Sequence, residues 1–255
     1  MTKKKISKKI VVLLSGGLDS STLAYFAARD SKPHLDHRVY TLTFDYGQRH
    51  KRELESAYKI SKAVGVLEHK IVKFDLTNWG GSALTDNKLK VPLKRNLWHA
   101  SAKLINKSIP NTYVPARNTI FLSFALSYAE AIGALEIYIG VNSVDYSGYV
   151  DCRGEFIRSF QDLVKVATVA GVNGRPVKIK TPLINMTKAD IVRLGTKLEV
   201  DWSKTWSCYL GEKLACGSCD SCQLRLKGFV QAGIIDPIKY KTFPKFYKEW
   251  LNSLC

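Results

Sequence analysis

The chain has 255 residues, of which 45% are hydrophobic, so it can bury a full core as one α/β domain with a small appendage. No apolar run approaches the roughly 20 residues that a membrane span needs, and the run after the N-terminal lysines is too short for a signal peptide, so we expect a cytoplasmic protein with no membrane partner. The 39 basic and 22 acidic residues give a formal net charge of +17, which favours anionic partners. Because no RNP-like motif accompanies this charge, we expect a solvated basic surface rather than direct nucleic-acid binding.

The first predicted elements are a buried strand at residues 10–14 and a helix over 22–29, joined by the hexapeptide SGGLDS at 15–20. Two adjacent glycines let the backbone turn sharply, so that unpaired N–H groups and the positive end of the helix are aimed at one point. Such a nest binds phosphate. The alternative interpretation is an ordinary glycine-containing turn between a strand and a helix.

Polar side chains around the glycines suit the same ligand. The hydroxyls of Ser15, Ser20 and Ser21 can donate to phosphate, and Asp19 can face a magnesium ion held between phosphate oxygens. No lysine follows the glycines, so the loop is not G-x-x-x-x-G-K-[ST], and the glycine spacing is not that of G-x-G-x-x-G. It resembles the SGG-x-DS loop of the ATP pyrophosphatase (PP-loop) superfamily, and this resemblance implies that it holds the β,γ-pyrophosphate of ATP while a substrate attacks the α-phosphate.

Strand and helix signals then alternate, as is typical of a parallel sheet covered on both faces. A second strand is predicted at 38–44, a helix over 53–64 and a third strand at 69–74. Ligands of doubly wound sheets lie beyond the carboxyl ends of the strands, so we expect Phe44 near the adenine. Residues 76–112 have weak periodicity, and we interpret them as a flap or mobile loop over the site.

The segment YVPARN at 113–118 leads into a long predicted helix whose apolar residues recur at helical spacing. Arg117 at the start of this helix can clamp phosphate with a fork of donors, or it is a surface arginine. A fourth strand is predicted at 135–141.

The fourth strand leads into a polar loop at 142–153, rich in carboxylates, tyrosines and hydroxyls. These residue types suit recognition of a flat, hydrogen-bonding ring, and we take Asp145, Tyr146 and Asp151 as candidate substrate-binding residues. The alternative is a generic turn whose tyrosines pack on the body of the protein.

Three further elements are expected: a helix over 155–169, a strand at 177–179 and a helix over 188–198. Thr187 and Asp190 have the spacing of a capping box for the last of these helices. Lys188 in its first turn reaches phosphate or is simply solvated, and the sequence does not decide between the two.

Four cysteines lie close together in the sequence, Cys208, Cys216, Cys219 and Cys222. In a cytosolic chain this spacing indicates a metal site rather than disulfides. Zinc is favoured because four thiolates close a tetrahedral structural site; an iron–sulfur cluster is the alternative, since successive C-x-x-C steps also occur in ferredoxins. We expect Cys152 and Cys255 to be unbound thiols.

The motifs SGGLDS, FDYGQRH, YVPARN, DYSGYVDCR, TWSCY and CGSCDSCQLR-x-x-GF, in this order, resemble the 7-cyano-7-deazaguanine synthase family of queuosine precursor biosynthesis. The resemblance runs from about residue 10 to residue 229. It implies an α/β fold of the adenine nucleotide alpha hydrolase type, with a doubly wound, mostly parallel sheet. We expect a PP-loop ATP-binding domain at residues 1–200 and a small helical zinc-binding region at 201–255.

The activity implied by the resemblance is ATP-dependent conversion of 7-carboxy-7-deazaguanine and free ammonia into a nitrile, by a homodimer that uses ATP, Mg²⁺ and Zn²⁺. Ser15, Asp19, Ser20 and Lys188 are the expected catalytic residues. The expected ATP-binding residues are Leu14, Ser15, Gly16, Gly17, Leu18, Asp19, Ser20, Ser21, Thr22, Leu23, Ala24, Phe44 and Arg117. Three alternatives are a PP-loop tRNA sulfurtransferase, a ligase that stops at the amide, and a non-enzymatic zinc-knuckle RNA binder. The RNA binder would give the SGGLDS loop no function.

Overall fold

The computed structural model describes residues 6–29, 35–95, 97–98, 109–142, 148–211 and 213–254. Within these ranges the centre is a five-stranded sheet in the order β3-β2-β1-β4-β5, and every neighbouring pair is parallel. The strands are β1 (Ile6–Leu13), β2 (Leu35–Asp45), β3 (Glu68–Lys73), β4 (Glu136–Tyr138) and β5 (Lys178–Lys180). The predicted doubly wound parallel sheet is confirmed.

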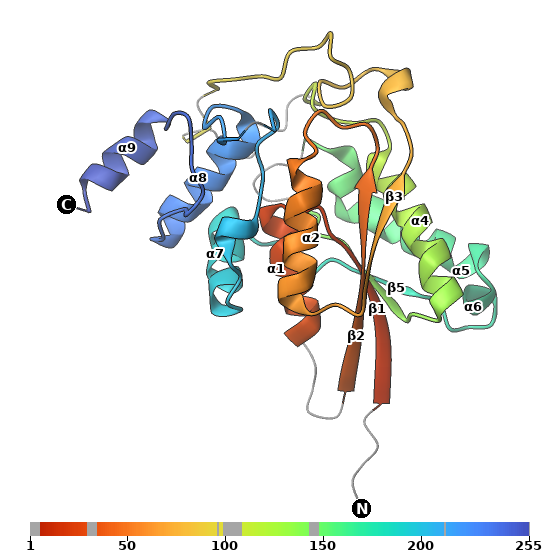
Figure 1. Ribbon diagram of the computed structural model, residues 1–255. Coiled ribbons are helices and arrows are strands. Elements are labelled where there is room, and N and C mark those ends of the chain that lie inside the picture. The colour runs from red at the N-terminus through yellow and green to blue at the C-terminus, as the bar shows by residue number, and fades with distance from the viewer. Residues whose placement is uncertain are drawn as a thin grey trace, which may run out of the picture.

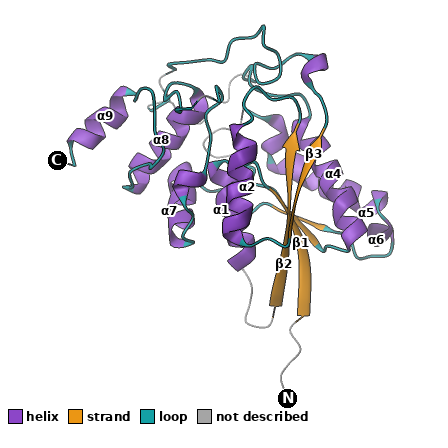
Figure 2. Ribbon diagram, in the orientation of Figure 1, coloured by secondary structure: helices purple, strands orange, loops and turns teal. Residues whose placement is uncertain are grey.

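Helices cover both faces of this sheet, as Figures 1 and 2 show. The α-helices are α1 (Leu18–Arg29), α2 (Arg52–Val64), α4 (Arg117–Ile132), α5 (Gly154–Ala167), α6 (Val169–Val172), α7 (Lys188–Lys197), α8 (Asp220–Ala232) and α9 (Lys245–Asn252). Short 3₁₀ turns are η1 (Thr77–Trp79), η2 (Val150–Cys152) and η3 (Trp202–Lys204). The helices α1, α2 and α7 lie on one side of the sheet, and α4, α5 and α6 lie on the other.

The continuous apolar run of β1 explains these two layers. Successive strand residues point to opposite faces, so Val11 and Leu13 pack with α4 and α5, whereas Ile10 and Val12 pack with α1 and α2. The strand order changes direction at β1, since the chain continues to β2 on one side of β1 while β4 pairs on the other. A switch of this kind opens a crevice beyond the carboxyl ends of the strands.

Two predicted elements are shorter in the structure. The fourth strand ends at Tyr138. Gly140 then packs against the SGGLDS segment at residues 15–20, called the phosphate loop after its predicted ligand, and a Cβ on Gly140 would lie 3.4 Å from the Ser20 nitrogen. The helix expected over 155–169 ends at Ala167, because Thr168 adopts an extended backbone and its hydroxyl accepts the Gly171 N–H. Arg117 begins α4, and the predicted capping box at the start of α7 is confirmed.

The C-terminal region joins the sheet domain through the packing of α8 on α7. Ala83 and Val91, from the segment expected to be a flap, are buried against the four neighbouring cysteines, so the described part of that segment is packed rather than free. The division at residues 200 and 201 stays a prediction. In the described part of the chain, no helix is long and apolar enough to cross a membrane.

A buried ion pair fixes the chain after α8. Arg225 donates to Asp236 through Nε at 2.6 Å and through a terminal nitrogen at 2.9 Å, and Tyr240 donates its hydroxyl to the same carboxylate at 2.7 Å. Both charged side chains are almost fully buried, with 1% and 0% exposed. Removing one partner leaves the other as an uncompensated buried charge.

We therefore predict that Asp236→Asn lowers the free energy of unfolding by about 3–5 kcal/mol, measured by urea denaturation. The control is Glu249→Gln, because Glu249 pairs with Lys245 at 3.6 Å with both side chains largely exposed. That change is expected to cost no more than about 1 kcal/mol. Equal effects of the two substitutions would contradict the role assigned to the buried pair.

Candidate active site

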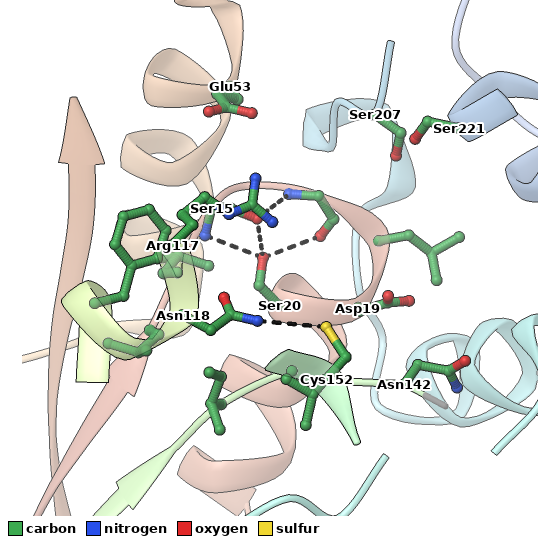
Figure 3. Close-up of a pocket in the computed structure, with 18 of the residues that line it drawn as sticks. Ser15, Asp19, Ser20, Glu53, Arg117, Asn118, Asn142, Cys152, Ser207 and Ser221 are labelled. Atoms are coloured by element: carbon green, nitrogen blue, oxygen red, sulfur yellow. Dashed lines mark hydrogen bonds between the residues drawn. The ribbon is translucent and has the colours of Figure 1, made fainter. Parts of the chain in front are cut away.

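A cavity of about 290 Å³ lies beyond the carboxyl ends of β1, β2 and β4. Its walls come from the loop between β1 and α1, the start of α2, the start of α4, and the region around the four cysteines. Figure 3 shows this convergence: Ser15 lies on the loop, Asp19 and Ser20 in the first turn of α1, Glu53 on α2, Arg117 and Asn118 on α4, and Ser207 and Ser221 on the C-terminal region. The cavity occupies the position that the strand order predicts for a ligand.

The phosphate loop is held by its own hydroxyls. Ser20 Oγ accepts the Ser15 N–H at 3.1 Å and lies 3.0 Å from Ser15 Oγ, as the dashed lines in Figure 3 mark. Ser15 is exposed, and it lines the cavity together with Gly17. Gly16 instead faces α2, where a Cβ would lie 2.5 Å from the Ala57 nitrogen, and its φ of +75° also favours glycine.

Asp19 and Lys188 form an ion pair at the edge of the cavity, with Lys188 Nζ 2.5 Å from Asp19 Oδ2. Both side chains line the cavity and are partly exposed. The other carboxylate oxygen, Oδ1, is buried and has no hydrogen-bond partner within the described residues. An unpaired carboxylate oxygen beside a phosphate loop fits a divalent cation, which prefers oxygen ligands.

The residues expected to bind ATP divide into two groups. Those that line the cavity are Leu14, Ser15, Gly17, Leu18, Asp19, Ser20, Phe44 and Arg117. Those that lie elsewhere are Gly16, Ser21, Thr22, Leu23 and Ala24; the last four are fully buried in α1. The second group supports the loop from beneath: Gly16 packs against α2, Thr22 donates to the Leu18 carbonyl oxygen, and Leu23 and Ala24 pack in the core. The buried Ser21 hydroxyl has no hydrogen-bond partner within the described residues.

Aromatic side chains form the part of the cavity wall at Phe44, where we expect the adenine of ATP to bind. Phe44 stacks on Phe121 with ring centroids 4.0 Å apart and planes inclined by 6°. Arg117 donates to the Tyr46 hydroxyl at 3.3 Å, and its guanidinium carbon lies 5.9 Å from the Tyr46 ring centroid. Burial raises the pKa of Tyr46 to about 12, so this phenol stays neutral and accepts from the arginine.

Several lining residues were not singled out from the sequence. Glu53 and His50 come from the start of α2 and the turn before it, while Asn142, Trp206 and Tyr209 come from distant parts of the chain. The signal for His50 was present, since it ends the motif FDYGQRH. No sequence spacing indicated that Trp206 would reach Gly16, to whose carbonyl oxygen it donates its N–H at 2.8 Å, or that Tyr209 would line the cavity, because these residues are far from the loop in the sequence.

Of the three candidate residues for ring recognition, the structure describes one, Asp151. Asp145 and Tyr146 lie outside the described residues. Asp151 is buried, with Oδ2 accepting the Asn118 N–H at 3.0 Å, so its carboxylate holds the first turn of α4. It is not among the described residues that line the cavity.

The four cysteines meet at one point and are all buried, with every Sγ within 4.8 Å of the others. Cys216 Sγ and Cys222 Sγ are 3.9 Å apart. Four thiolates about 2.3 Å from a tetrahedral zinc ion would be separated by about 3.8 Å, so the donor set fits this metal.

Fold and loop together define an α/β protein of the class that uses ATP through a PP-loop. The family model described as "Queuosine biosynthesis protein QueC" matches residues 9–233. Proteins named 7-cyano-7-deazaguanine synthase are similar over most of their length: one from a Nostoc species is 51% identical over 91% of this chain and 97% of its own. Another, from Thermoplasma volcanium, is 51% identical over 97% of each chain. The chain therefore belongs to the QueC family, and the resemblance that the motifs indicated is confirmed.

Among solved structures, NMN synthetase from Francisella tularensis is 15% identical, with a TM-score of 0.43 over 96% of this chain and 82% of its own. A likeness of this strength supports no functional conclusion.

The cavity also contains a thiol, Cys152, which is free and buried and accepts a hydrogen bond from the Asn118 amide at 3.3 Å. Burial raises the pKa of Cys152 to about 12, so the reactive thiolate is scarce at physiological pH. We predict that iodoacetamide leaves Cys152 unlabelled in the native protein at mildly alkaline pH, while the urea-unfolded protein is labelled, as read by peptide mass spectrometry. Rapid native labelling would contradict this and would reveal a nucleophile in the cavity.

Proposed function

We propose that this protein converts 7-carboxy-7-deazaguanine, ammonia and ATP into 7-cyano-7-deazaguanine, the product that gives its curated relatives their name. The observation that carries the proposal is the SGGLDS loop on the cavity wall of a chain that belongs to this family. The loop alone is compatible with any ligase that transfers AMP from ATP. Membership of the family is what favours 7-carboxy-7-deazaguanine as the substrate.

The chemistry requires activation because a carboxylate has poor leaving groups. Attack of one carboxylate oxygen on the α-phosphate of ATP releases pyrophosphate and forms an acyl adenylate. Ammonia then displaces AMP and loses a proton, which yields the amide. A second ATP must then adenylate the amide oxygen and release pyrophosphate. The oxygen leaves with AMP while the nitrogen loses its two protons, so the nitrile carbon keeps no oxygen. One cavity thus holds two successive electrophilic intermediates, and positioning supplies much of the rate.

The phosphate loop has the groups that this reaction needs. Backbone N–H groups and the hydroxyls of Ser15 and Ser20 stabilise charge that develops on the pyrophosphate leaving group. Lys188 pairs with Asp19. This contact holds its ammonium group beside the loop, where it can interact with the same charge. Asp19 is the residue that would hold Mg²⁺, which when bound neutralises the phosphate oxygens. No covalent nucleophile is needed, which agrees with the raised pKa of Cys152.

The nucleotide site extends from the loop to the neighbouring wall. We assign ATP to the segment from Leu14 to Ala24, where the first residues contact the ligand and the later ones support the loop, and to Phe44 and Arg117. The aromatic wall at Phe44 supports placing the adenine there.

We assign one zinc ion to Cys208, Cys216, Cys219 and Cys222. The short Sγ–Sγ separations support a single ion. The thiolates of an iron–sulfur cluster are bound to different iron atoms and lie farther apart. Such a closed four-thiolate site leaves no open position for chemistry, so its role is structural.

The remaining expectations rest on the family. We propose a homodimer in the cytoplasm that takes up free ammonia. That Asp145, Tyr146 and Asp151 read the deazaguanine ring stays a prediction, and for Asp151 the described contact is with α4.

The direct test is to incubate the protein with ATP, ammonia and 7-carboxy-7-deazaguanine and to identify the products by mass. The nitrile is expected. An amide as the final product would favour a ligase that stops at that stage, and an unchanged base would contradict the proposal.

We predict that Asp19→Ala and Ser15→Ala leave the thermal melting temperature nearly unchanged but lower the rate of nitrile formation. One change removes a cation contact, and the other removes a phosphate donor, whose loss typically costs about 10²–10³ in rate. Ser123→Ala is the control, because Ser123 is exposed on α4 away from the cavity. Near-normal turnover in both loop variants would show that the loop is only a structural turn.

We predict one zinc ion per chain by metal analysis. Cys216→Ser should lose the metal and the melting transition of the C-terminal region, since binding of structural zinc contributes directly to folding. Cys152→Ser, which removes a thiol outside the group, should retain the metal. Iron with sulfide, or active protein without metal, would count against the assignment.

A further inference from the structure

Glu53 is held rigidly at the cavity wall by a buried glutamine. Gln48 Nε2 donates to Glu53 Oε1 at 2.8 Å and to the Phe44 carbonyl oxygen at 3.0 Å. Its own Oε1 accepts the Tyr46 N–H at 2.8 Å. Gln48 is 2% exposed, and these three bonds fix both ends of its amide, so it orients Glu53 toward one direction.

A buried histidine holds the other oxygen. His50 Nε2 lies 3.1 Å from Glu53 Oε2, and His50 is 4% exposed, whereas Glu53 itself keeps 17% of its side chain accessible. Each carboxylate oxygen thus has one donor from the protein. Because an ionised carboxyl group has about four acceptor positions, Glu53 can accept two more hydrogen bonds from a ligand.

Glu53 is also distinguished by what else lines the cavity. Among the described lining residues the carboxylates are Asp19 and Glu53. Asp19 belongs to the phosphate loop and pairs with Lys188, whereas Figure 3 shows Glu53 on α2, far across the drawn site from Asn142 and Cys152. Glu53 is instead held by Gln48 and His50 and keeps acceptor positions open, so it suits a ligand that presents N–H donors.

We propose that Glu53 binds the aminopyrimidinone edge of the deazaguanine base, accepting one hydrogen bond from the ring N–H and one from the exocyclic amino group. The proposal rests on the proposed function, which supplies a substrate with this edge. Two adjacent donors match two carboxylate oxygens. Adenine presents one amino group beside a bare ring nitrogen, an acceptor that a carboxylate repels, so the same contact keeps the base of ATP out of this position.

Gln48 and His50 act in this scheme as positioning residues. They keep the carboxylate in one rotamer, so that little conformational freedom is lost when the base binds. Tyr209, whose ring centroid lies 6.1 Å from that of His50, lines the same side of the cavity and offers an aromatic surface for the base.

The test compares Glu53→Gln and Glu53→Asp with Glu55→Gln, a control on the same helix turn whose side chain is exposed and lies off the cavity. KM for the base, KM for ATP and kcat are measured with the full-length protein. Glu53→Gln puts an amide N–H against the amino group of the base, and we expect KM for the base to rise about 10- to 100-fold with KM for ATP nearly unchanged. The control should behave as the wild-type protein.

A second substrate sharpens the test. The wild-type protein should prefer the natural base over the analogue without the 2-amino group by about tenfold or more in kcat/KM, because the analogue leaves one acceptor of Glu53 unpaired. Glu53→Gln should lose most of this preference. Absence of the preference in the wild-type protein would overturn the proposal even if neither Glu53 variant folds.

The remaining outcomes separate this inference from the proposed function. If the wild-type protein makes no nitrile, the proposed function fails and the assignment of Glu53 fails with it. If nitrile forms and the Glu53 variants bind the base normally, or lose ATP or Mg²⁺ affinity instead, the assignment of Glu53 alone is wrong. Loss of base affinity in Asp145→Asn or Asp151→Asn, with Glu53 variants unaffected, would place recognition in the loop after β4.

Discussion

The absence of a side chain at Gly16 allows three parts of the molecule to meet. A Cβ there would lie 2.5 Å from the Ala57 nitrogen and 2.6 Å from the Glu53 carbonyl oxygen, so only glycine lets the phosphate loop touch the backbone of α2. The Gly16 carbonyl oxygen in turn accepts the Trp206 N–H at 2.8 Å. The loop, the helix that carries Glu53 and the segment that leads to the cysteines are therefore fixed relative to one another through one residue.

This meeting gives the proposed zinc site a structural role. Trp206, Ser207 and Tyr209 form part of the cavity wall and lie next to Cys208 in sequence. The segment packs in a separate apolar cluster built around the four cysteines, which also includes Ala83, Val91 and Trp206. A metal ion that binds the four thiols would stabilise the segment, and with it one wall of the cavity.

Local chemistry made much of the fold predictable from the sequence. The apolar run at 10–14, the glycine turn and the capping residues Thr187 and Asp190 each act within a few residues. The structure confirms the strand, the helix after the turn and the capping box, although that helix begins at Leu18 rather than at residue 22. The C-x-x-C spacing likewise predicted that the four cysteines would lie together, and in the structure their sulfur atoms do.

What escaped prediction depends on contacts between distant segments. Glu53 has no recognisable spacing; its position on the cavity wall results from the close approach of α2 to Gly16 and from its bonds to Gln48 and His50. Asp151 was expected to face a ligand, yet its carboxylate holds the start of α4, more than thirty residues earlier in the chain. Sequence patterns identify residue types that suit a ligand, but tertiary packing decides which of them reach the cavity.

The central claim is that the nucleotide and the deazaguanine base share one cavity, with phosphates at the SGGLDS loop and the base against the wall formed by α2 and the cysteine region. The measurement that tests it most directly is a crystal structure with a non-hydrolysable ATP analogue and 7-carboxy-7-deazaguanine bound together. We expect phosphate density beside Ser15 and Asp19, and base density in the same cavity with its carboxylate directed toward the α-phosphate. Base density outside this cavity, or phosphates away from the loop, would contradict the claim.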